Sequence, residues 1–259
     1  TTLGQRMHGR VALTPDTSQT GPLLDAIPLR QTTRSEYDGR PLPSAEFDRL
    51  QNLALEPGIA LRWVTTPQDR DTVLDYVTQG NVNQYTNTAF VDELMEWLRF
   101  NRREALSALD GLYTRSSGNA EVPRWLGQMF VGGTDPQAQA DADASKLRSS
   151  AGVVVVASDR EDRTAWVRAG QVYERLALTL TSRDIKSAFL NQPIEVAALR
   201  DSFRTALGLT STSPQLLVRY GYGDWLPRSL RRPVDQVMEV SWHPLGRPGR
   251  ARAVSIMAG

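Results

Sequence analysis

Cysteine is absent from the 259 residues of this sequence. Disulfides, a thiolate nucleophile, iron–sulfur clusters and zinc held by cysteine are therefore excluded. Histidine is nearly absent as well, because His8 and His243 are the only two. With so few ligands of these types, a histidine-rich metal site is not expected.

Long hydrophobic runs are also missing. A membrane helix needs about 20 apolar residues in a row, and no such run occurs, so we expect no membrane span. The first ten residues, TTLGQRMHGR, are not followed by the apolar core of a signal peptide. Because the chain begins with Thr1 rather than Met, we expect it to be processed, trimmed or cut from a longer product. A soluble protein is expected, and both the cytoplasm and export to the periplasm stay open.

Lysine is scarce, since only Lys146 and Lys186 occur and 28 of the 30 basic residues are arginine. With 29 acidic residues the formal net charge is +1, which argues against nucleic acid as a partner. A GC-rich genome accounts for most of the arginine excess. The functional alternative is that some arginines bind planar anions such as phosphate, which a guanidinium grips better than an ammonium does.

Several common catalytic motifs do not occur: GxGxxG, GxxxxGK[ST], HExxH and GxSxG. Their absence argues against nucleoside-triphosphate hydrolysis, metalloproteolysis and α/β-hydrolase chemistry. Acidic pairs such as Asp92-Glu93 lie on the solvated face of an expected helix, so they do not indicate a glycosidase pair.

The hydrophobic pattern predicts a protein with both strands and helices. The fully apolar run 153–157 is typical of a central strand. Residues 162–180 should form a long central helix, with Trp166, Val167 and Tyr173 on its buried face. Further strands are expected at 59–64, 187–190 and 215–222, and further helices near 23, from 44, and at 69–78, 88–106 and 194–207. This order predicts an α+β fold in which a mixed central β-sheet is sandwiched by helices.

We expect three parts along the chain. Residues 1–26 are polar and rich in turn-forming residues, and we interpret them as an N-terminal arm or linker. Residues 27–238 form the main domain. Residues 239–259 contain much Gly, Pro and Arg, which indicates a C-terminal extension rather than core.

The stretch 110–144 inside the main domain is rich in Gly, Pro, Asn and Ser and is predicted to be irregular. An irregular stretch of this length in a compact domain is typically a lid or a binding loop. A disordered insertion is the alternative. Tyr113, Trp125 and Phe130 favour packing over disorder.

The segment Pro28–Ser35 is the first candidate binding segment. It has two arginines four positions apart with hydroxyl residues between them. A helical turn or tight bend would bring Arg30, Thr32 and Arg34 together on a phosphate or on the polar edge of a ring. A solvated basic turn explains the same residues without a ligand, and the pattern alone favours that explanation.

Two further candidate segments follow expected strands, where loops commonly carry binding residues on a rigid support. The basic segment 228–233 supplies three arginines. The strand end 190–192 supplies amides that both donate and accept hydrogen bonds, which suits a heteroaromatic ring. A polar strand-to-helix turn is the structural alternative for this strand end. The candidate residues are Arg228, Arg231, Arg232, Leu190, Asn191 and Gln192.

Together these segments resemble the FMN-dependent nitroreductase fold. The closest similarity is to the Acg branch, whose members are described as nitroreductase-like proteins with twin-arginine signals. The resemblance covers about residues 27 to 238, and the order and spacing of its pieces make it fairly specific. The stretches that carry it are IPLRQTTRSEYDGRPLP (27–43), EWLRFN (96–101), DGLYTRSSGN (110–119), the AGVVVVAS strand, GQVYERLALTLT (170–181), AFLNQPIEV (188–196) and LVRYGYGDWLPRSLRRPV (217–234).

The resemblance implies FMN as the cofactor. In nitroreductases the first segment holds the flavin phosphate, ribityl chain and pyrimidine edge, and the closing basic segment, here led by Arg231, completes the phosphate clamp. The strand end presents backbone N–H to flavin N5 and polar groups to the ring. No catalytic side chain is implied, because the flavin carries the chemistry. The cofactor-binding residues implied in this way are Arg30, Thr32, Arg34, Leu190, Asn191, Gln192, Arg228, Arg231 and Arg232.

The sequence also departs from the family pattern. Ordinary nitroreductases carry a Pro-Ser-x-x-Asn-x-Gln-Pro-Trp stretch soon after the first segment, and this chain has none. The Acg branch is similar to two fused nitroreductase halves, and this chain resembles the second half with a short leader. A second nitroreductase-like half or a homodimer partner is then expected to complete the flavin site.

Three functions remain open. The first is an FMN-dependent oxidoreductase that passes hydride from NAD(P)H through FMN to a nitro or quinone-type aromatic acceptor. The second is an FMN-sequestering or storage protein of the Acg type, with the stretch 110–144 as a lid over the flavin and little turnover. The third is an interaction module without a cofactor.

Overall fold

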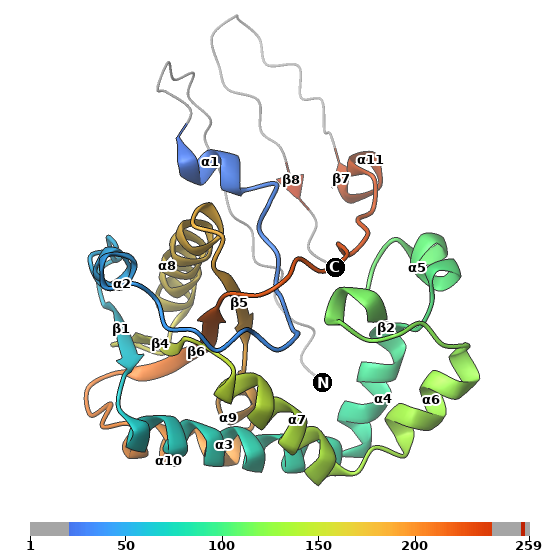
Figure 1. Cartoon of the computed structure of the whole chain (residues 1–259), viewed down its shortest axis with the longest axis horizontal. Coiled ribbons are helices and arrows are strands. Elements are labelled where there is room, and N and C mark those ends of the chain that lie inside the picture. The colour runs from blue at the N-terminus through green and yellow to red at the C-terminus, as the bar shows by residue number, and fades with distance from the viewer. Residues whose placement is uncertain (1–20, 240–254, 257–259) are drawn as a thin grey trace, which may run out of the picture.

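The computed structural model describes residues 21–239 and 255–256. Its centre is a four-stranded sheet in the order β1 (Ile59–Val64), β4 (Gly152–Ser158), β6 (Ser213–Gly221) and β5 (Lys186–Phe189) (Figure 1). The hydrophobic pattern predicts each of these strands to within two residues at either end. The expected α+β fold is confirmed.

Neighbouring strands of the four-stranded sheet all pair antiparallel. Within the described residues, parallel pairing is confined to an isolated bridge between Thr32 and Ser187 and to the short pair β2 (Leu98–Arg99) and β3 (Leu112–Tyr113). The bridge lies beside β5, the last strand of the sheet. The segment that contains Arg30 and Arg34 therefore runs along the edge of the sheet and supplies its parallel component.

Helices cover both faces of the sheet (Figure 1). One face carries four of them, and the other carries two. The helices of the first face are α3 (Pro67–Tyr85), α7 (Pro136–Arg148), α9 (Gln192–Glu195) and α10 (Ala197–Ala206), and those of the second are α2 (Ser44–Gln51) and α8 (Arg163–Ser182).

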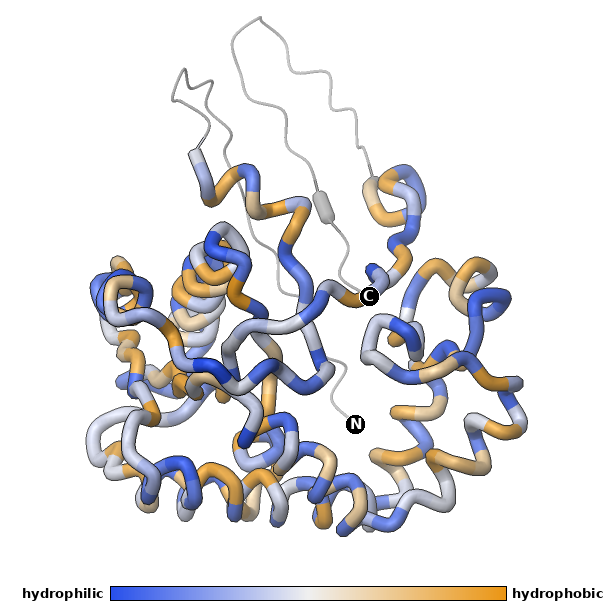
Figure 2. Tube along the Cα trace, in the orientation of Figure 1, coloured by the Kyte–Doolittle hydropathy of each residue, from blue (hydrophilic) through white to orange (hydrophobic). Residues whose placement is uncertain are grey.

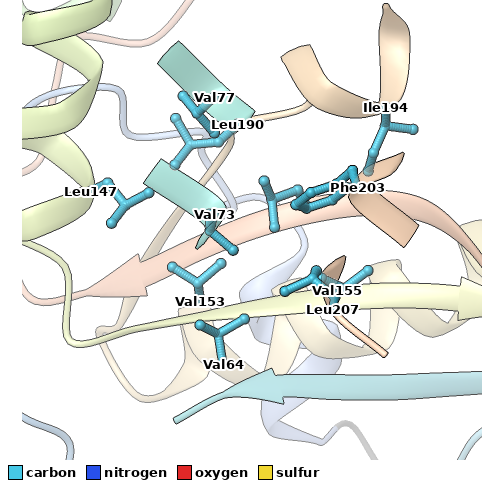
Figure 3. Packing of buried hydrophobic residues seen from close by; sticks show 11 residues of the cluster. Val64, Val73, Val77, Leu147, Val153, Val155, Leu190, Ile194, Phe203 and Leu207 are labelled. Atoms are coloured by element: carbon cyan, nitrogen blue, oxygen red, sulfur yellow. The ribbon is translucent and has the colours of Figure 1, made fainter. Parts of the chain in front are cut away.

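The core is built on β4, which is buried along its whole length. Successive side chains of a strand point to opposite faces. Val153 and Val155 therefore pack with Val73 and Phe203 in the cluster of Figure 3, while Val154 packs on the other side in the cluster that contains Leu176. Apolar side chains on both faces explain why this strand shows no alternation of polar and apolar residues.

The long central helix α8 begins one residue after its N-cap, Asp162, whose carboxylate accepts a hydrogen bond from the backbone N–H of Ala165 at 2.9 Å. Its predicted buried face is partly wrong, because Trp166 and Val167 are 49% and 54% exposed. Along the first turns of α8, the residues that pack on the sheet lie one position before the predicted ones, as Ala165 does relative to Trp166. They are Ala165, Ala169, Val172 and Leu176, followed by Leu180.

The predicted helix 88–106 is broken in the structure. α4 (Thr88–Trp97) leads into β2, and α5 (Arg102–Ala108) follows. The break lies at Asn101, whose side chain caps α5 by accepting from the backbone N–H of Glu104 at 3.1 Å. Apolar spacing alone did not reveal this cap.

The expectation that 110–144 is irregular is wrong. After β3 and a short 3-10 helix η1 (Thr114–Ser117), the chain forms α6 (Arg124–Gly132) and then α7. Proline in the first turn helps to start α7, where its N–H is not needed. We call residues 88–134 the α4–α6 module, and it lies to one side of the sheet in Figure 1. Figure 2 shows apolar stretches along α6.

The remaining elements are short. The predicted helix 194–207 is divided into α9 and α10 at Val196, and Gly208 ends α10 with a φ of +68°. The others are α1 (Pro22–Ala26), α11 (Val234–Val237), β7 (Met238–Glu239) and β8 (Ser255–Ile256).

Most of the expected N-terminal arm (1–26) and C-terminal extension (239–259) lies outside the described residues. No helix in the described part of the chain has the length and hydrophobicity needed to cross a membrane.

Candidate functional site

A pocket of about 940 Å³ lies between the β5 edge of the sheet, α7 and the α4–α6 module. Charged and amide side chains from the sheet side and α7 line one part of it. Apolar side chains of the module line much of the rest. The first group comprises Arg34, Glu36, Asp143, Lys146, Gln192 and Arg219, and the second Leu94, Leu98, Phe100, Leu112, Val122, Phe130 and Val131. A large pocket with a few convergent polar groups is the usual form of a small-molecule site.

The arginine segment, residues 28–35, reaches the pocket with a firmly held backbone. The N–H of Thr33 donates to the carbonyl of Ser187 at 2.9 Å, and the hydroxyl of Tyr37 donates to the carbonyl of Thr33 at 3.0 Å. Thr33 is fully buried. This anchoring directs Arg34 toward the pocket that it lines.

Arg219 of β6 ties the arginine segment to the sheet. Its guanidinium donates to the carbonyls of Thr33 (3.2 Å), Ser35 (2.8 Å) and Lys146 (3.3 Å). It also lies over the ring of Tyr37, 4.1 Å from the centroid. Only 1% of Arg219 is exposed, and burial lowers its pKa. Arg219 therefore holds the backbone of the arginine segment and of α7 in place. The sequence signal that could have revealed this role is a single arginine within the apolar part of the strand.

Arg34 is the cation that stays available in the pocket. Within the described part of the chain, no hydrogen bond or ion pair engages its guanidinium. Desolvation by the surrounding protein lowers its pKa, and the phenol of Tyr173 opposes that shift. A guanidinium in such surroundings is suited to an anionic or strongly polar ligand.

Tyr173 of α8 links the two arginines of the segment. Its hydroxyl interacts with Arg30 and Ser187, and its ring packs on Phe189 with the centroids 4.8 Å apart. Burial raises the pKa of Tyr173, while the charge of Arg30 acts in the opposite direction. The raised pKa keeps the phenol protonated at neutral pH, so it does not cancel the charge of Arg30 or Arg34. The apolar pattern marks Tyr173 only as a packing residue.

In the strand end 190–192, one side chain stabilises the fold and the other two line the pocket. The side-chain oxygen of Asn191 accepts from the backbone N–H of Leu217 at 2.8 Å, so this side chain joins β6 to the turn. Leu190 and Gln192 line the pocket, and Leu190 is also part of the core cluster of Figure 3.

The closing basic segment packs beside the arginine segment but does not line the pocket. Gln31 joins the two, since its amide donates to the carbonyl of Leu226 at 2.8 Å and accepts from that residue's N–H at 3.2 Å. Arg228 donates to the carbonyl of Pro28. Arg231 is exposed, and its guanidinium bonds only weakly to the carbonyl of Leu230, at 3.4 Å.

Arg232 is occupied by an ion pair with Asp110 of the α4–α6 module. Asp110 also pairs with Arg99 at 2.7 Å. These two guanidiniums, Arg232 first, hold the pKa of the Asp110 carboxyl below its usual range. Arg232 is thus committed to a protein partner, whereas the guanidinium of Arg231 has no acidic partner among the described residues.

The structure therefore brings only part of the predicted set together. Arg34, Leu190 and Gln192 share the pocket, whereas Arg30 does not line it and interacts with Tyr173 of α8. Thr32 lies at the edge of β5. Among the described residues, no group of three or more His, Asp or Glu side chains is arranged to hold a metal ion.

Comparisons with known proteins also point to nitroreductases. No family model matches the chain. Over 235 residues it is 28% identical to "Putative NAD(P)H nitroreductase Rv3131" of Mycobacterium tuberculosis strain H37Rv, and the counterpart in strain CDC 1551 matches equally. The alignment covers 88% of this chain and 64% of the relative, so the chain spans less than two thirds of the length of these curated relatives.

Solved structures of low sequence identity show the fold. The FMN and NADPH-dependent nitroreductase NfnB from sphigopyxis sp. strain HMH, a mutant form, superposes with a TM-score of 0.56 and 16% identity, covering 86% of this chain and 99% of that one. The FMN-dependent nitroreductase NfnB from Mycobacterium smegmatis, in complex with NADPH, gives 0.53 and 13%, covering 85% and 98%. A nitroreductase with bound FMN from Bacteroides fragilis gives 0.50 and 14%, covering 86% and 100%. The chain has a nitroreductase-like fold, as its resemblance implies.

Proposed function

We propose that this chain supplies the FMN-binding part of an oxidoreductase that takes hydride from NAD(P)H and passes electrons to a nitro or quinone-type aromatic acceptor. The observation that carries the proposal is the convergence of Arg34, Leu190 and Gln192 on one pocket, from segments more than 150 residues apart. The similarity to nitroreductases that are named as FMN- and NAD(P)H-dependent supports it.

The residues of the pocket fit FMN in size and in polarity. Small-molecule pockets measure roughly 300 to 1,000 Å³, and this one is about 940 Å³. Arg34 is a cation without a partner among the described residues, and the amide oxygen of Gln192 is buried without a donor. The amide oxygen of Gln192 needs a donor, since a buried acceptor without a hydrogen bond is costly. Arg34 is exposed, so an anionic group of a ligand can reach its guanidinium.

Each part of the pocket has a role in this proposal. Arg34 meets the phosphate from the pocket wall, and Arg30 and Arg231, which lie outside the pocket lining, are the further cations that the resemblance assigns to the phosphate. Gln192 meets the polar edge of the ring, and Leu190 packs beside it. The apolar wall of the α4–α6 module keeps water from the ring. The bound flavin supplies hydride transfer, so no acid or base is required of the chain.

A partner half is part of the proposal as well. The chain lacks the Asn-x-Gln-Pro-Trp stretch of ordinary nitroreductases. We propose that a second nitroreductase-like half or a second copy of the chain completes the flavin site.

One observation favours the second candidate, an FMN-sequestering protein of the Acg type with the module as its lid. The module forms an entire wall of the pocket and is tied to the closing segment. The hydroxyls of Ser229 and Ser116 lie 3.2 Å apart, and Arg232 pairs with Asp110. A wall held in this way would restrict stacking of NAD(P)H on the flavin.

The test begins with the absorbance of the purified protein after incubation with FMN and desalting. Bound flavin with anaerobic bleaching by NADPH supports the oxidoreductase. Bound flavin that bleaches with dithionite but not with NADPH supports sequestration. Absence of flavin bands both in the chain alone and in the chain mixed with a second nitroreductase-like half would overturn both and leave the cofactor-free interaction module. Arg34→Ala should release FMN, whereas Arg148→Ala, an exposed change on α7, should not.

A further inference from the structure

Asp143 of α7 is a buried carboxylate at the pocket wall, only 6% exposed. One of its oxygens, Oδ2, accepts from the amide of Asn81 at 3.0 Å and from the amide of Gln192 at 3.0 Å. The other, Oδ1, accepts from the ammonium of Lys146 at 2.9 Å. Three donors therefore bind this carboxylate, and they occupy both of its oxygens.

This arrangement leaves only one orientation for the Gln192 amide. Its Nε2 donates to Asp143 and, at 3.3 Å, to the side-chain oxygen of Asn81. A flipped amide would place Oε1 against these two oxygens, with no proton between them, which is repulsive. Oε1 must therefore point away from Asp143, where it is buried and finds no donor among the described residues.

Close packing also fixes the backbone of Gln192. A side-chain carbon on Gly80 of α3 would lie 2.5 Å from Cβ of Gln192 and 2.9 Å from its carbonyl carbon. Glycine at this position lets α3 and α9 approach, so Gln192 is held from its backbone as well as from its amide. An acceptor fixed in this way is pre-organised for one donor position.

We infer that Asp143 is a positioning residue, which holds the Gln192 amide so that Oε1 accepts a hydrogen bond from a ring N–H of the ligand. The inference rests on the proposed function, in which that ligand is FMN. The oxidised isoalloxazine ring has a single N–H, at N3 of its pyrimidine edge. The pocket would thereby select a ring with an imide N–H over one in which that position is blocked.

The test compares FMN with its N3-methyl analogue, which lacks this proton, by the dissociation constants from flavin fluorescence. The wild-type protein should prefer FMN by about 10-fold, as expected for one hydrogen bond to a buried acceptor. In Asp143→Asn, Lys146 will attract the remaining oxygen and turn the new amide nitrogen toward Gln192. The Gln192 amide then flips, and the preference should fall to near one. Asp141→Asn removes an exposed carboxylate from the same helix and should keep the preference.

Gln192→Leu provides a second variant in case Asp143→Asn does not fold, as judged by circular dichroism. It removes the acceptor, so it should also abolish the preference. Equal affinity of the wild-type protein for both flavins would overturn the inference while leaving the proposed function intact. A preference that survives in Gln192→Leu would do the same, because steric exclusion of the methyl group would then explain it. No binding of FMN at all would refute the proposed function itself.

Discussion

Replacing Arg219 with methionine should destabilise the protein and loosen its pocket together. Arg219 donates to three backbone carbonyls and lies over the Tyr37 ring. Two of those carbonyls, at Thr33 and Ser35, belong to the arginine segment. Methionine has a similar length and keeps the apolar contacts, but it leaves all three carbonyls without this donor.

The expected cost follows from these contacts. The carbonyl of Ser35 loses its one donor among the described residues, which costs about 1–3 kcal/mol. The carbonyls of Thr33 and Lys146 keep hydroxyl donors, so each costs only about 0.5 kcal/mol, and the contact with the ring adds about 1 kcal/mol. Relief of the guanidinium's desolvation offsets part of this sum, as the lowered pKa of Arg219 indicates. We expect a net loss of about 3 kcal/mol, which lowers the melting temperature by about 6–12 °C in a domain of this size.

The assay is thermal unfolding followed by circular dichroism, with FMN affinity measured on the same samples. Arg148→Met is the matched control, because Arg148 is exposed and its change should stay within about 0.5 kcal/mol. FMN affinity should fall in Arg219→Met even well below its melting temperature, since the backbone that directs Arg34 is released. A melting temperature equal to that of the control would refute the reasoning.

Three further predictions concern other parts of the fold. Tyr173→Phe removes the hydroxyl that interacts with Arg30, so the preference for FMN over riboflavin, which lacks the phosphate, should fall several-fold if Arg30 binds the phosphate; an unchanged ratio of the two dissociation constants would contradict this role. Val155→Ala in the fully buried β4 should cost about 2 kcal/mol in urea unfolding, and a cost below about 0.5 kcal/mol would show that the core there is loosely packed. Burial raises the pKa of Tyr220 to about 12. Because the folded state holds this proton more tightly than the unfolded one, the stabilisation is complete below about pH 10 and is lost as the pH rises to about 12. Tyr220→Phe should therefore show a weaker alkaline loss of stability, and an identical pH profile would argue against Tyr220 as its source.

Local pattern was sufficient for the strands of the sheet. The run of valines in β4 predicts a strand buried on both faces, and the structure buries every residue of it. The boundaries of α8 follow from Asp162, a good N-cap, and from the apolar spacing after it. These features depend on residues a few positions apart.

Local pattern failed where a capping residue or a neighbouring helix decides the structure. Asn101 interrupts the apolar stripe that predicts one helix over 88–106, and a region rich in Gly and Pro forms α6 and most of α7. On α8, Trp166 lies at the solvent while Ala165 packs inward. Small residues pack inward there because the helix lies close to the sheet.

The sequence by itself determined the fold class, the strands and the three segments in which binding residues were sought. Only the tertiary structure decided which of those residues share a pocket, because that depends on backbone held across long sequence separations, as by the bonds from Arg219 to Thr33 and Ser35. The tertiary structure also decided that Arg232 forms an ion pair with Asp110 and that Asp143 accepts a hydrogen bond from the amide of Gln192. Such pairings depend on distances in space, which the order of residues along the chain does not contain.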